Sequence, residues 1–123
     1  MDNYNLYKTL RRLYPNGDSR FYKVMIELMT LYNDKQSDYA TIEEPFRNFT
    51  DVADNLVKYG IITEENKELK VALVYAYKQW DAICKMIGQG NKGKAESLID
   101  KLNDISVYAI IIRILYEEKI KCQ

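Results

Sequence analysis

Residues 96–112 read ESLIDKLNDISVYAIII, an acidic row that leads into an apolar belt. Within this stretch Glu96, Asp100 and Asp104 recur every four positions, a spacing that places all three on one face of a helix. Like charges at this spacing repel by about 0.2–0.5 kcal/mol per pair, so the row is unfavourable unless something positive binds it. The belt that follows is typical of a central, buried helix. The stretch therefore predicts a long core helix with one acidic face.

Carboxylates are hard oxygen ligands, which suit Mg²⁺ or Mn²⁺ better than zinc. The chain has no His and only two cysteines, Cys84 and Cys122, so a Cys₄ zinc site and any site that needs His are excluded. The same row is also compatible with a solvated acidic face that Lys94, Lys101 or a neighbouring helix neutralises. Its spacing predicts a metal site but does not exclude the solvated alternative.

Apolar residues at three- and four-residue spacing predict four more helices, so the chain is expected to be all-α. Ser19 is the expected N-cap of the second helix. Pro45 is a favoured first residue for the third helix, which Gly60 closes. Including the core helix, the expected ranges are residues 4–14, 21–35, 45–60, 63–87 and 94 or 95 to 119.

The intervening segments predict turns and loops at residues 15–18, 36–44 and 88–93. We therefore expect a compact bundle of about five helices, a single domain over residues 1–123. Residues 1–18 would form an additional helix and turn, and residues 19–119 the helical core.

Composition limits the classes of function. The 123 residues carry 18 basic and 18 acidic side chains, a balance that argues against an extended nucleic-acid surface or an anionic membrane surface. The longest apolar run, residues 107–115, contains Arg113 and is far shorter than the roughly 20 residues of a membrane span. No apolar core of a signal peptide is present at the start of the chain. We therefore expect a cytoplasmic protein whose chemistry relies on carboxylates, Lys, Arg and hydroxyl groups.

The second predicted helix contains VMIELMTL, residues 24–31, in which six of eight residues are strongly apolar. Such a helix is expected to be buried on more than one side. Glu27 lies inside this stretch, Asp34 follows seven residues later, and Asp38 lies at the helix exit. A buried carboxylate without a partner is costly, so Glu27 needs a cation or a hydrogen-bond network, or else it marks a solvated stripe.

The order of the predicted helices and of their acidic residues along the chain resembles that of the MazG-like all-α NTP pyrophosphatase superfamily, in particular the small phage and bacterial nucleotide-modification-associated domains. Glu27 followed by KQSDY at residues 35–39 resembles the first motif, with its K-x-x-D-Y segment. Residues 78–83, KQWDAI, resemble the middle helix, and residues 96–108 resemble the final E-S-x-x-D-x-L-x-D-x-x-x-Y motif. The resemblance covers about residues 21–116. Two features depart from the family: Thr30 replaces a second Glu, and the final acids are spaced by four instead of three.

The resemblance implies a Mg²⁺-dependent nucleoside triphosphate pyrophosphohydrolase that releases pyrophosphate and a nucleoside monophosphate, with Mn²⁺ as an alternative metal. It also implies a homodimer or homotetramer, and the host cytoplasm if the protein is phage-encoded. The implied residues are Glu27, Glu96, Asp100 and Asp104 for the metal, Glu27, Asp38 and Asp100 for catalysis, and Lys35, Lys78, Tyr39 and Tyr108 for the nucleotide.

Two other classes of function stay open. The missing second Glu favours a non-catalytic protein of the phage type that binds or sequesters a nucleotide. If the acidic row is only a solvated helix face, the chain is expected to be a helical interaction protein. Tyr77 and Trp80 are expected in the core or in an interface, and Cys84 is expected to be a buried thiol. Apolar belts on the second, fourth and fifth predicted helices exceed what one small bundle hides, which predicts self-association.

Overall fold

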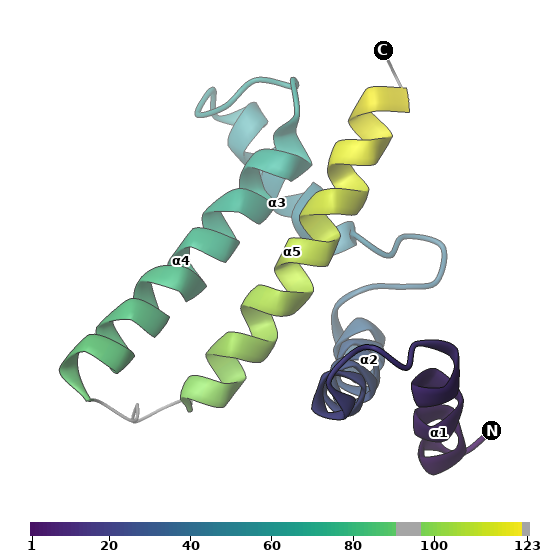
Figure 1. Cartoon of the computed structure of the whole chain (residues 1–123). Helices are drawn as coiled ribbons and strands as arrows, with labels where there is room; N and C mark the ends of the chain where they lie inside the picture. The colour runs from purple at the N-terminus through teal and green to yellow at the C-terminus, as the bar shows by residue number, and fades with distance from the viewer. Residues whose placement is uncertain (91–96, 122–123) are drawn as a thin grey trace. The chain divides into compact units, whose positions relative to one another are not determined.

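The computed structural model describes residues 1–90 and 97–121 (Figure 1). These residues form no strand, and their helices are α1 (Asn3–Leu13), α2 (Ser19–Tyr39), α3 (Arg47–Lys58), α4 (Lys67–Gln89) and α5 (Leu98–Lys121). The prediction of an all-α protein with about five helices is confirmed. In the described part of the chain, no helix combines the length and apolarity that crossing a membrane requires.

The chain divides into two compact units, Met1–Tyr39 and Ala40–Gln123. In the first unit α1 packs on α2, and in the second α4 contacts both α3 and α5. The division therefore falls after α2. Each unit has its own core: Tyr22 and Ile26 in the first, and Phe49, Ala53, Val71, Ala72, Ile83, Ile111 and Leu115 in the second.

Helix α2 begins at Ser19, two residues before the predicted start, and Asp18 caps it in place of Ser19. The Asp18 Oδ1 atom accepts a hydrogen bond of 2.8 Å from the backbone N–H of Arg20. At its other end α2 continues to Tyr39, through residues that were predicted to form a loop. No Gly or Pro occurs in residues 36–39, so nothing in this segment breaks the helix.

The ends of α3 and α4 also differ from the prediction. Helix α3 begins at Arg47, two residues after Pro45, and α4 begins only at Lys67. The Lys67 ammonium group lies 2.6 Å from a carboxylate oxygen of Asp54 on α3 and 2.9 Å from one of Glu64. The contact with Asp54 ties the start of α4 to α3. Hydrogen bonds to Asp54 and then Glu64 hold the pKa of Lys67 above its ordinary value.

The core of the second unit is built around three aromatic rings, one from each helix. Phe49 of α3, Tyr75 of α4 and Tyr108 of α5 have ring centroids separated by 5.8 to 6.1 Å. Helices α4 and α5 run side by side in opposite directions (Figure 1). The rings of Tyr75 and Tyr108 contact each other, and both contact the ring of Phe49. Phe49 is only 2% exposed, which makes it the centre of this cluster.

We expect the substitution Phe49→Ala to lower the free energy of unfolding by about 3–5 kcal/mol, because it leaves a cavity between three helices. Urea unfolding followed by far-ultraviolet circular dichroism measures the change. The matched control is Phe21→Ala, since Phe21 is 62% exposed, and its effect should stay within about 1 kcal/mol. Equal effects of the two substitutions would contradict the central position of Phe49.

Candidate anion-binding site

The turn between α1 and α2 is held by a contact between its two ends. The Tyr22 hydroxyl on α2 donates a hydrogen bond to the backbone carbonyl of Tyr14 at the end of α1. Gly17 passes so close to this hydroxyl that a Cβ atom at this position would lie 2.5 Å from it. A residue with a side chain therefore does not fit at position 17 unless Tyr22 moves, and the turn needs glycine here.

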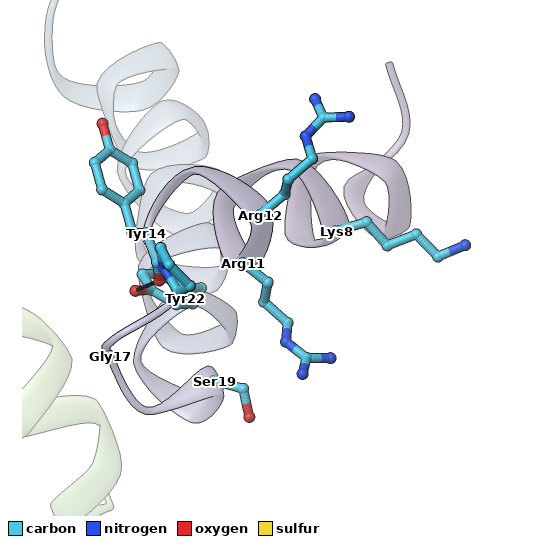
Figure 2. A pocket seen from close by; sticks show the side chains of 8 residues that line it. Lys8, Arg11, Arg12, Tyr14, Gly17, Ser19 and Tyr22 are labelled. Carbon is cyan, nitrogen blue, oxygen red and sulfur yellow. Dashed lines mark hydrogen bonds between the residues drawn. The ribbon is translucent and has the colours of Figure 1, made fainter.

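A pocket of about 510 Å³ opens beside this turn (Figure 2). Figure 2 shows the cationic ends of Lys8, Arg11 and Arg12 extending from α1, with Ser19 at the start of α2. No acidic residue lines the pocket, whose lining is Lys8, Arg11, Arg12, Tyr14, Pro15, Gly17, Ser19 and Tyr22. The volume lies within the range of small-molecule sites, and the lining suits an anion.

Residues 8–23 contain five basic side chains and a single acidic one, Asp18, although the charges of the whole chain sum to zero. Asp18 is already paired, since its Oδ2 lies 2.6 Å from a guanidinium nitrogen of Arg20. Hydrogen bonds from the Arg20 side chain and backbone also hold the pKa of Asp18 below its ordinary value. The other cations, Lys8, Arg11, Arg12 and Lys23, therefore give this region a positive potential.

The positive charges of this region also act on Tyr7 of α1. Its pKa is lowered first by a hydrogen bond with the Ser19 side chain, and also by the charges of Arg11 and Lys23. The Lys23 ammonium lies 5.2 Å from the centre of the Tyr7 ring and the Arg11 guanidinium carbon 5.6 Å from it. The charges of Arg11 and Lys23 act in the same direction on other anions that approach this region.

The predicted metal ligands are distributed over both units. Glu27 and Asp38 are exposed on α2 in the first unit, whereas Asp100 and Asp104 lie on α5 in the second. Glu96 lies outside the described residues. Within residues 1–90 and 97–121, no three His, Cys, Asp or Glu side chains form a group that could hold a metal. Among the described acids, Glu27 and Asp38 therefore belong to no such group in the first unit, nor do Asp100 and Asp104 in the second.

Asp100 takes part in the start of α5. Its Oδ2 accepts a hydrogen bond of 3.1 Å from the backbone N–H of Ser97, and the Ser97 hydroxyl oxygen accepts one of 3.1 Å from the backbone N–H of Asp100. This reciprocal pair is a capping box, with Asp in the place of the usual Glu. The capping role accounts for an acidic residue at position 100 without a metal, while Asp104 is half-buried one turn further along α5.

The residues predicted to contact a nucleotide are likewise divided between the units. Lys35 and Tyr39 are exposed on α2, and Lys78 is exposed on α4. Tyr108, which was expected beside a nucleotide, packs against Phe49 and Tyr75 in the core of the second unit.

Two expectations about burial were wrong. Helix α2 buries only Tyr22 and Ile26, so Glu27 is exposed and needs no buried partner. Cys84 is an exposed free thiol, because on α4 the neighbouring Ile83 faces the core and Cys84 faces away from it.

Comparison of the chain with protein-family models, curated proteins and solved structures finds no match. The resemblance to the MazG-like superfamily therefore stays a prediction.

Sequence reasoning missed the basic pocket, because the overall charge balance conceals the local excess of cations. The signal was nevertheless present: Lys8, Arg11 and Arg12 are spaced i, i+3 and i+4, which places them near one another on α1.

We expect Ser19→Ala to raise the pKa of Tyr7, because it removes the hydrogen bond that contributes most to lowering that pKa. Nuclear magnetic resonance of ¹³C-labelled tyrosine measures the titration of the ring. Ser37→Ala, an exposed serine further along α2, serves as the control and should leave the pKa of Tyr7 unchanged. An unchanged pKa in the Ser19 variant would contradict the described contact.

The capping role of Asp100 predicts that Asp100→Ala lowers the free energy of unfolding by about 1 kcal/mol, with the same loss whether or not Mg²⁺ is present. Thermal unfolding with and without millimolar Mg²⁺ measures both quantities. A metal role would give a different result: Mg²⁺ would raise the melting temperature of the wild type, and Asp100→Ala would abolish that rise.

Proposed function

We propose that this protein binds a phosphate-bearing nucleotide in the basic pocket of the α1–α2 unit. The observation that carries the proposal is the lining of the pocket, in which Lys8, Arg11 and Arg12 meet no acidic side chain. Guanidinium groups bind phosphate oxygens through two parallel hydrogen bonds, so an arginine side chain that lines the pocket suits a phosphate group.

Aromatic rings beside the pocket suit the base of a nucleotide. Tyr14 lines the pocket and is 60% exposed, so one face of its ring is available for stacking. Tyr4 is also exposed, and the Lys8 ammonium lies 4.4 Å from the centre of its ring. Residues 4–14 thus carry both cations and exposed aromatic rings, a combination that recognises a phosphate and a base together.

Magnesium-dependent pyrophosphohydrolysis is a second candidate. It is favoured by the spacing of the acids at positions 96, 100 and 104 in the sequence and by Glu27, which is exposed and has no ion-pair partner among the described residues. Here Glu27, Glu96, Asp100 and Asp104 would hold Mg²⁺, with Asp38 assisting, because carboxylate oxygens are ligands that this ion prefers. Bound Mg²⁺ offsets the charge of a triphosphate, and Lys35 and Lys78 would contact its oxygens. A homodimer or homotetramer in the cytoplasm also belongs to this proposal.

Titration calorimetry with nucleoside mono-, di- and triphosphates tests the binding site. We expect affinity to rise with the number of phosphates and to fall with added salt. The double substitution Arg11→Gln with Arg12→Gln should weaken binding at least tenfold, because it removes two charge-assisted contacts. The control is Arg47→Gln, which removes an exposed arginine that pairs with Asp51 on α3. Equal binding by both variants and the wild type would refute the pocket as the site.

Pyrophosphate release from the same nucleotides in millimolar Mg²⁺ distinguishes the two candidates. Binding without any change in the nucleotide supports a non-catalytic protein. Release that Glu27→Gln abolishes supports the pyrophosphohydrolase, and release that persists in this variant would contradict the role given to Glu27.

A further inference from the structure

One side of α4 presents an uninterrupted row of large side chains to solvent. The row consists of five exposed residues: Leu73, Tyr77, Trp80, Cys84 and Ile87. The four other than Cys84 are between 49% and 68% exposed. Successive members are four, three, four and three residues apart, which is the spacing of the a and d positions of a heptad repeat. We call these five residues the α4 stripe.

The buried side of α4 is already occupied. It carries Val71, Ala72 and Ile83, and α4 contacts α3 and α5. The α4 stripe is therefore additional to the core of its unit, and a helix that is apolar on both sides needs a second partner. Surface apolar residues that occur singly need no explanation, but five at heptad spacing mark a contact surface.

We propose that the α4 stripe is the contact between two copies of this chain, with α4 of one copy packed along α4 of the other. A heptad seam packs best on another heptad seam, and a two-fold axis places the same stripe on both sides of one interface. No stripe residue lines the basic pocket, so the proposal stands independently of the proposed nucleotide site.

The size of the stripe agrees with a weak to moderate dimer. An aromatic side chain buries about 150–250 Å², so Tyr77, Trp80 and their two large aliphatic neighbours offer on the order of 500 Å² per copy. Two copies would bury roughly 1,000 Å², close to the lower limit of about 1,200 Å² for specific interfaces. Val74, exposed next to the stripe, adds to this area.

The charges around the stripe do not oppose self-pairing. The α4 stripe itself contains no ionisable group other than the thiol of Cys84 and the phenol of Tyr77. Asp81, which lies between these two residues on the helix surface, is paired with Lys85 at 2.9 Å. Two copies can therefore approach without bringing unpaired carboxylates together.

Sedimentation velocity of the full chain between 1 and about 100 µM tests the proposal. We expect the mass to rise toward twice the single-chain value of 14.5 kDa. Trp80 is the only tryptophan, so its fluorescence should shift to shorter wavelength over the same concentrations as its ring leaves water. A single-chain mass at the highest concentration would overturn the proposal, whether the stripe is then covered by another protein, by a lipid surface or by nothing.

Tyr77→Glu places a charge in the centre of the stripe and should weaken the dimer at least tenfold, with unchanged helical circular dichroism because Tyr77 is exposed. Ile42→Ser is the control: Ile42 is 96% exposed but lies outside α4, and its substitution should leave the dimer intact. Should Tyr77→Glu lose helicity, the tryptophan shift of the wild type decides the question. A dimer that is equally stable in the Tyr77 variant and the wild type overturns the proposal, because the interface then lies elsewhere.

Discussion

The hydrogen bond from the Tyr22 hydroxyl to the Tyr14 carbonyl is the constraint on which the candidate site depends. It fixes the reversal of the chain between α1 and α2, and Gly17 makes room for it. Because of this reversal, the arginines in the last turn of α1 lie next to the beginning of α2. The shape of the pocket thus follows from a contact of an aromatic side chain and from one position without a side chain, whereas its positive charge comes from α1.

The helices could be predicted from periodicity, but their ends and the site could not. The spacing of apolar residues located all five helices, whereas local hydrogen bonds decided the ends, as with Asp18 at the start of α2. Cys84 and Glu27 are exposed because each lies on a side of its helix that packs against no other helix of its unit among the described residues. The apolar residues next to them in the sequence do not show which side that is. The basic pocket depends on a reversal of direction that brings uncharged side chains of α2, Ser19 and Tyr22, beside the cations of α1, and the net charge of the whole chain, which is zero, does not reveal it.

The small size of the first unit connects stability with binding. With Tyr22 and Ile26 as its buried residues, a unit of two helices in Met1–Tyr39 has little apolar area to offset its conformational entropy. The clustered cations of residues 8–23 also repel one another. An anion in the pocket relieves this repulsion and stabilises the folded form in proportion to the logarithm of its concentration. Ligand binding and folding of this unit are therefore expected to be coupled.

The capping box at the start of α5 has a consequence for evolution. Ser97 and Asp100 each satisfy a backbone N–H of the other, so a change at one position alters the selective pressure on the other. Descendants of this chain are expected to replace the two together, for instance by Thr with Glu, whether or not any chemistry is retained. The initiation of a helix is then enough to explain an acid that persists at position 100 through such a lineage.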